Sequence, residues 1–114
     1  MYQEGEGVRQ DYAKAKEWYE KAANQGVASA QNNLGMSYHK GEGVRQNDTK
    51  AFEWFEKSAN QGNSYAQYSL GRMYYKGEAV RENTSLAKEW FGKSCDNGNQ
   101  NGCDIYRMLN EQGY

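Results

Sequence analysis

The chain has 114 residues, the size of one small domain, and 25% of them are charged. There are 14 Lys and Arg against 15 Asp and Glu, and the resulting net charge of −1 argues against binding to nucleic acid or to an anionic membrane. No apolar run reaches the roughly 18–20 residues that a membrane-spanning helix needs, so membrane insertion is not expected.

A six-residue phrase recurs along the chain at a fixed interval. GEGVRQ occupies residues 5–10 and 41–46, and the near copy GEAVRE occupies 77–82. The copies begin 36 residues apart each time (41 − 5 and 77 − 41). Because a period of about 20–50 residues marks a repeat architecture, the chain is expected to fold as a row of similar units.

The first residues align with the inside of a unit. Met1 and Tyr2 match Met73 and Tyr74, near the end of a helix in a complete unit. We therefore expect Met1 to be an interior position of a longer natural array that extends upstream.

One helix of each unit is predicted over about 12–25, 48–61 and 84–97. In the first stretch, small and apolar residues recur with the spacing of one helix face, at Ala15, Trp18, Tyr19, Ala22 and Ala23. The candidate N-caps are Asp11, Asn47 and Asn83, and the candidate left-handed residues after the helices are Gly26, Gly62 and Gly98. Three tryptophans share one position of the period and are interpreted as core side chains: Trp18, Trp54 and Trp90.

The other helix of each unit ends at a glycine, Gly41 or Gly77. Its apolar face is formed by Ala30, Leu34 and Tyr38 in one unit and by Ala66, Leu70 and Tyr74 in the next. Gly35 and Gly71 lie inside these helices, where glycine costs about 1 kcal/mol relative to alanine, and their recurrence predicts close approach of the partner helix with its tryptophan. Each unit is thus predicted to be a pair of antiparallel helices, with the GEGVRQ phrase as the loop between them.

The motifs LGxxYxxGEGVRQ and AFEWFEKSANQG together resemble the Sel-one-like repeat family, a relative of the tetratricopeptide repeat. The resemblance covers essentially the whole chain and implies an all-α, right-handed α/α solenoid. It divides the chain into a partial repeat (1–26), two repeats (27–62 and 63–98) and a C-terminal capping helix (99–114). Arg107 replaces the glycine of Gly35 and Gly71, which fits a last helix that admits no further partner.

Both cysteines fall at one predicted corner of the fold. Cys95 replaces Ala23 and Ala59 near a helix end, and Cys103 lies beyond the turn at Gly98. Antiparallel helices would bring them face to face, either as a disulfide or as two buried thiols. The spacing also resembles that of a secreted, cysteine-rich bacterial branch of the family. A bridge would indicate a periplasmic or secreted protein, and free thiols a cytoplasmic one.

Recognisable catalytic and cofactor-binding motifs are absent from the sequence. The single histidine, His39, has no obvious acidic or thiol partner, and two cysteines with one histidine do not make a metal site. We therefore expect a non-enzymatic protein that uses no cofactor and no metal. The alternative comes from the resemblance, because some cysteine-rich relatives bind or slowly hydrolyse β-lactams.

The resemblance implies a concave groove that binds a protein or peptide and is lined by the first helix of each hairpin. Its positions correspond to Ser29, Asn32, Met36 and His39; to Tyr65, Tyr68, Arg72 and Tyr75; and to Asn101, Asp104, Met108 and Glu111. Aromatic residues with an arginine are typical of binding surfaces, although the tyrosines would also fit between neighbouring helices as packing. Both interpretations stay open for different rings.

A last expectation concerns the N-terminal end of the array. The helix at about 12–25 has no first-helix partner of its own, whereas solenoids normally end in a polar cap. Its aromatic face would remain uncovered, so we expect the chain to self-associate through this end.

Overall fold

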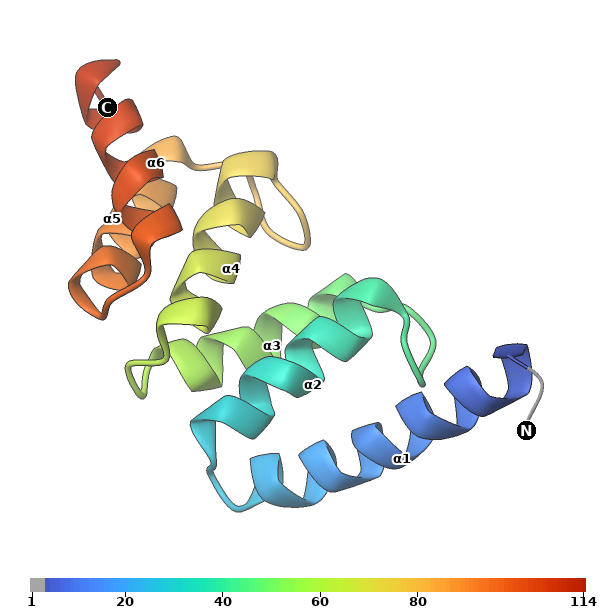
Figure 1. Cartoon of the computed structure of the whole chain (residues 1–114). Coiled ribbons are helices and arrows are strands. Elements are labelled where there is room, and N and C mark those ends of the chain that lie inside the picture. The colour runs from blue at the N-terminus through green and yellow to red at the C-terminus, as the bar shows by residue number, and fades with distance from the viewer. Residues whose placement is uncertain (1–3) are drawn as a thin grey trace.

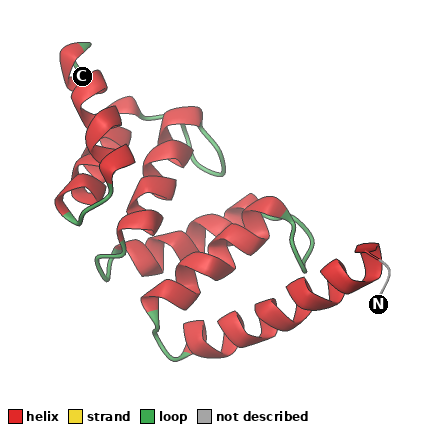
Figure 2. Ribbon diagram, viewed as in Figure 1, coloured by secondary structure: helices red, strands yellow, loops and turns green. Residues whose placement is uncertain are grey.

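A computed structural model describes the backbone of residues 4–114 and the side chains of residues 14–114. Within this range the chain forms the helices α1 (Glu4–Asn24), α2 (Ala28–Lys40), α3 (Asp48–Ala59), α4 (Ser64–Lys76), α5 (Thr84–Asp96) and α6 (Gln100–Glu111). The described residues contain no strand (Figure 2).

Each helix packs against its neighbour in the sequence, and the result is an elongated array of 53 × 26 × 25 Å (Figure 1). Long loops join α2 to α3 and α4 to α5, whereas short turns join α1 to α2, α3 to α4 and α5 to α6. The predicted all-α solenoid of helical hairpins is confirmed.

The GEGVRQ loop is held by the helix that precedes it. Gly41 ends α2 with a left-handed φ of 73°, and its N–H donates to the Ser37 carbonyl at 2.8 Å. At the far end of the loop, the Asn47 N–H donates to the Tyr38 carbonyl at 2.9 Å. The loop after α4 repeats both hydrogen bonds at the equivalent positions, and Ala79 adopts a left-handed φ of 64° there.

The expectation of a loop at residues 5–10 is wrong, because α1 runs through this copy of the phrase. In the two loops that form, the carbonyls that accept the closing hydrogen bonds belong to the preceding helix. For the first copy, the equivalent carbonyls would come from residues 1 and 2, which lie outside the described residues. Because α1 begins at Glu4, Asp11 lies inside this helix and is not an N-cap.

The other helix ends agree with the sequence. The Asn47 side chain accepts from the Lys50 N–H and the Asn83 side chain from the Leu86 N–H, so both are N-caps. The three turn glycines that follow α1, α3 and α5 have positive φ values: Gly26, Gly62 and Gly98.

Close contact between a phenylalanine and a glycine sets the spacing within each hairpin. Phe55 of α3 is 2% exposed and lies against Gly35 of α2. A β-carbon added at Gly35 would lie 2.8 Å from the ring, too close for any side chain. Phe91 and Gly71 make the same contact between α5 and α4. The predicted close approach is present, but phenylalanine rather than tryptophan makes it.

The interpretation of the tryptophans as core side chains is wrong for all three. Trp18 is 74% exposed, and Trp54 and Trp90 are half-buried, each with a lysine ammonium over its ring. The buried face of α3 is centred on Ala51 and Phe55, and a neighbouring residue is rotated by about 100° around the helix. The tryptophans therefore lie at the edge of the core.

An aromatic contact joins the two hairpins. Phe52 of α3 meets Tyr74 of α4 edge-on, with ring centroids 5.7 Å apart. Burial, and after it the Glu56 carboxylate, raises the pKa of Tyr74 above its usual value.

Polar side chains fix the short turns between hairpins. The buried Gln31 donates from Nε2 to the Ala23 carbonyl at 3.1 Å, across the turn from α1 to α2. Gln67 makes the same bond to the Ala59 carbonyl at 3.1 Å, across the turn from α3 to α4. Because an unpaired buried amide is costly, each of these bonds favours one angle between successive helices.

We expect Phe55→Ala to lower the free energy of unfolding by about 3–5 kcal/mol, since it removes a fully buried ring. Trp54→Ala should cost less, roughly 2–3 kcal/mol, because part of the indole is already exposed. Chemical denaturation of the two variants beside the wild type measures the difference. A larger loss for Trp54→Ala would contradict this description of the core.

Candidate binding groove

The predicted groove positions on α4 separate into exposed and packed side chains. Tyr65 and Tyr75 are 67% and 43% exposed, and Arg72 is exposed between them along the helix. Tyr68 is half-buried and meets Phe91 edge-on at 5.5 Å between ring centroids. The packing interpretation therefore applies to Tyr68, and the other three side chains are free to contact a partner.

The predicted positions on α2 lie at different depths. Asn32 is buried and its Nδ2 lies 3.9 Å from the Met36 sulfur, while its Oδ1 has no hydrogen-bond partner in the described part of the chain. Met36 is 36% exposed, and His39 is half-buried. A buried acceptor without a donor costs free energy. Asn32 is unusual in this respect, because the other buried side-chain nitrogen and oxygen atoms of the described residues have hydrogen-bond partners.

A small pocket forms where these α2 and α4 residues meet. It has a volume of about 80 Å³, and its lining is Met36, His39, Lys40, Phe55, Ser69, Arg72, Met73 and Glu78. The structure thus brings Met36, His39 and Arg72 of the predicted set together. Tyr65 and Tyr75 lie outside this lining.

The predicted positions on α6 are separate from the pocket. Asp104 is exposed, accepts from the Gln100 amide at 2.9 Å and pairs with Arg107 at 3.2 Å. Met108 is 42% exposed. Both residues belong to the C-terminal helix α6, so they would contact only a partner long enough to extend there.

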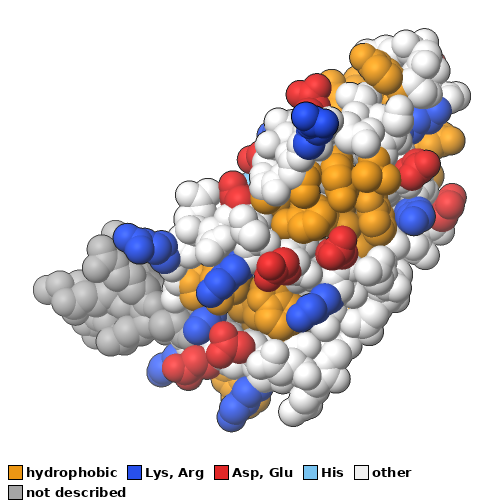
Figure 3. All heavy atoms as spheres, turned by 180° about the vertical axis from the view of Figure 1, so that it is seen from behind, with side chains coloured by type: hydrophobic (Ala, Val, Ile, Leu, Met, Phe, Trp, Pro, Cys, Tyr) orange, Lys and Arg blue, Asp and Glu red, His pale blue; other side chains and the backbone are white. Residues whose placement is uncertain are grey.

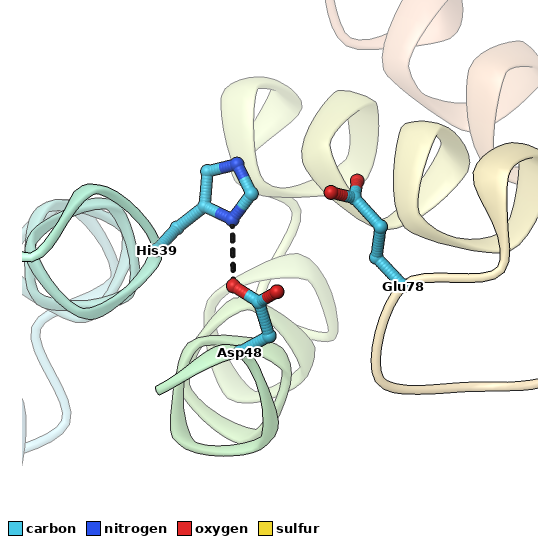
Figure 4. Close-up of side chains that lie close together, drawn as sticks. All are labelled: His39, Asp48 and Glu78. Atoms are coloured by element: carbon cyan, nitrogen blue, oxygen red, sulfur yellow. Dashed lines mark hydrogen bonds and ion pairs between the residues drawn. The ribbon is translucent and has the colours of Figure 1, made fainter. Parts of the chain in front are cut away.

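His39 has an acidic partner that the sequence does not reveal. Its Nδ1 lies 3.0 Å from Asp48 Oδ1, although the two residues are nine positions apart, because the long loop returns α3 alongside α2. The Glu78 carboxylate, from the loop after α4, faces the same pair (Figure 4). The expectation that His39 lacks an acidic partner is therefore wrong.

Cys95 of α5 and Cys103 of α6 form a disulfide, with their Cα atoms 4.5 Å apart. Of the two alternatives left open by the sequence, the structure contains the bridge. Cys95 and Cys103 occupy the positions of Ala59 and Gln67 one period earlier (95 − 36 and 103 − 36). At this last turn a covalent bond therefore takes the place of the glutamine-to-carbonyl hydrogen bond.

The residues missed by sequence reasoning are Asp48, Glu78 and the two turn glutamines. A signal for the glutamines was present, because Gln31 and Gln67 are one period apart near the start of a helix. Asp48 carries no such signal, because Thr84 stands one period after it. Glu78 recurs as Glu42 one period earlier, but its partners come from another repeat, which the period does not indicate.

The surface charge is mixed rather than of one sign. On the face opposite to that of Figure 1, acidic and basic side chains alternate around grouped apolar side chains (Figure 3). None of the helices in the described residues combines the length and apolar character needed to cross a membrane.

Three Sel1 repeats match the sequence, at residues 1–27, 28–63 and 64–99. The chain belongs to the Sel1 repeat family. Repeats of this family generally act in protein–protein interaction.

Three of the solved structures that resemble this chain come from bacteria. The Sel1 repeat protein from Oxalobacter formigenes has a TM-score of 0.84 and 34% identity, over 89% of this chain and 42% of its own. The protective antigen c5321 of uropathogenic Escherichia coli, which displays an SLR fold, has a TM-score of 0.87 and 40% identity, over 96% of this chain and 23% of its own. Cysteine-rich protein B of Helicobacter pylori (hcpB) has a TM-score of 0.76 and 26% identity, over 79% of this chain and 68% of its own.

A curated relative matches a shorter segment. The sel1-like repeat-containing protein L21 of Acanthamoeba polyphaga mimivirus is 51% identical over 39 residues, which are 34% of this chain and 7% of that protein. This chain therefore spans a small part of L21 and less than half of the first two solved structures.

Reduction of the disulfide should lower the free energy of unfolding by about 2–3 kcal/mol, as chain-entropy reasoning gives for so short a loop. Chemical denaturation with and without reductant measures this loss. The control is the double variant Cys95→Ala/Cys103→Ala, which should be insensitive to reductant. Two titratable thiols in protein denatured directly after isolation from its native compartment would contradict the bridge.

Proposed function

We propose that this chain is a non-enzymatic module that holds a peptide or protein segment against α2 and α4. The pocket between these helices is the observation that supports the proposal. Its apolar lining comes from Met36, Phe55 and Met73, and its charged lining includes Arg72. An apolar pocket with a few polar groups beside it suits a side chain that is anchored at one point and oriented at another.

The size of the pocket favours an aliphatic side chain as the anchor. A cavity of about 150 Å³ accepts benzene, whereas this pocket measures about 80 Å³. A Val, Ile or Leu side chain therefore suits the volume of this pocket better than an aromatic ring does. Arg72 and Lys40 would then pair with a carboxylate or carbonyl oxygen next to the anchor, because both line the same pocket.

Asn32 supplies a hydrogen-bonding group behind the pocket. Its unpaired Oδ1 is buried beside Met36, whose flexible thioether can move without a large change in the backbone. In the bound state Met36 shifts, and Asn32 accepts an N–H of the bound segment. Tyr65 and Tyr75, exposed on the same helix as Arg72, extend the contact beyond the pocket.

The disulfide supports a periplasmic or secreted location, because such bridges persist in oxidising compartments. The alternative function, β-lactam binding or slow hydrolysis as in cysteine-rich relatives, remains a prediction from the family resemblance alone. Turnover of a chromogenic β-lactam tests it directly.

A second proposal is self-association through the N-terminal end of the array. Trp18 on α1 is 74% exposed, whereas its equivalents Trp54 and Trp90 are half-buried against the rest of the fold. An indole this exposed is a strong candidate for a contact residue.

Light scattering over a concentration series should show a rising mass for the wild type and a constant monomer mass for Trp18→Ser. Tyr65→Ser is the matched control, because it removes an exposed aromatic ring from a different helix. A monomeric wild type at high micromolar concentration would contradict self-association.

Peptides selected from a random library on the wild-type protein test the groove. We expect them to lose about tenfold or more in affinity for Ser69→Phe, which fills the pocket, and for Arg72→Ala. Ser85→Phe is the matched control, since Ser85 is exposed at the start of α5. Peptides that bind Ser69→Phe and the wild type equally would contradict the proposal, provided that both proteins unfold at similar temperatures.

A further inference from the structure

We propose that His39, Asp48 and Glu78 form a binding site for a divalent transition-metal ion, with Zn²⁺ as the best-matched ion. The three side chains come from α2, from the start of α3 and from the loop after α4, and they point toward one another (Figure 4). Each is half-buried. No assumption about the peptide groove enters this proposal.

The distances fit a shared ion. His39 Nδ1 and Asp48 Oδ1 are 3.0 Å apart, and one ligand atom from each of the three residues lies within 4.8 Å of the others. Zinc bonds to nitrogen and to carboxylate oxygen measure about 2.0–2.2 Å, so two ligands of one ion are separated by roughly 3.0–3.5 Å. The first pair already has this separation, and a small movement of the Glu78 side chain gives the other two.

The charges also fit a divalent cation. Two carboxylates and a neutral imidazole carry a charge of −2, which the ion would neutralise. In the described part of the chain, Asp48 pairs only with His39, and Glu78 has no ion-pair partner. Lys40 and Arg72 line the pocket that His39 and Glu78 also line, and neither forms an ion pair with Asp48 or Glu78 in the described part of the chain.

The ligand types select among metals. Imidazole suits Zn²⁺, Ni²⁺ and Cu²⁺, whereas Mg²⁺ and Ca²⁺ prefer sites made of oxygen alone. Three protein ligands with an open fourth position match the ligand count of zinc sites that keep a water ligand, and imidazole and carboxylate are both zinc ligands. An ion can bind Nδ1 of His39 only through its lone pair, so the proton of the neutral ring would lie on Nε2 in the metal-bound state, and bonds to the ion would replace the contact between Nδ1 and Asp48.

The cluster is specific to one place in the array rather than a consequence of the repeat. One period later, the three positions are occupied by Tyr75, Thr84 and Tyr114 (39 + 36, 48 + 36 and 78 + 36). The ligands belong to two successive hairpins, so a bound ion would link α2 and α3 to the loop of the next hairpin. It would hold that loop in place and restrict movement between the two repeats.

Calorimetric titration of the full, disulfide-intact chain with Zn²⁺ tests the proposal, with Co²⁺ absorption as a second readout of inner-sphere ligands. We expect one saturable site per chain and a higher unfolding temperature with the metal. Asp48→Asn and Glu78→Gln should each weaken Zn²⁺ binding about tenfold or more. Glu42→Gln is the matched control, because Glu42 is the equivalent loop carboxylate one period earlier (78 − 36) and should leave affinity unchanged.

Each alternative result overturns the site. Absence of saturable binding at Zn²⁺ concentrations up to the high micromolar range would do so. So would equal affinities of the wild type and Glu78→Gln, which would indicate adventitious binding elsewhere. Glu78→Gln lies in a loop and leaves the helices intact, so a loss of binding with an unchanged unfolding temperature of the metal-free protein cannot be ascribed to misfolding.

Discussion

A phenylalanine ring on the bare backbone of a glycine sets the distance between the two helices of each complete hairpin. Phe55 on Gly35 and Phe91 on Gly71 bring the helix axes closer than any side chain at the glycine would allow. The long loop can close only because the helices lie this near, and its closure brings Asp48 alongside His39. Glycine destabilises the interior of a helix. The packing of a fully buried phenylalanine ring against it offsets this cost.

A second type of joint connects one hairpin to the next. Gln31 and Gln67 each bond to a carbonyl across a short turn, and a disulfide replaces this bond at the last turn. α6 has no following helix among the described residues, so it receives packing from fewer neighbours than α2 or α4. The disulfide joins α6 to α5 and constrains the unfolded chain as well as the folded one.

The sequence predicted the parts of the fold that local chemistry determines. The period located the helices, and asparagine and glycine located their ends, because caps depend on residues within one turn of the helix. Prediction failed where the local structure depends on contacts with a segment that is distant in the sequence. The phrase at residues 5–10 is identical to that at 41–46, yet α1 runs through the first copy, whereas the second forms a loop closed by carbonyls of α2. The exposure of Trp18 likewise depends on which helices flank α1.

The cluster of His39, Asp48 and Glu78 was harder to predict, because the positions of His39 and Asp48 differ between the repeats and Glu78 comes from the next hairpin. Phe55, Gly35 and Gln31 have equivalents one period later, since every joint must have the same geometry. His39 and Asp48 instead face Glu78 from the next hairpin, and none of the three is repeated in the following copy.

Residues that do not repeat are free to change without altering the joints, so the same backbone can present different chemistry at each junction. The period of this sequence therefore determines its architecture, and the departures from the period determine which side chains the surface between two hairpins presents.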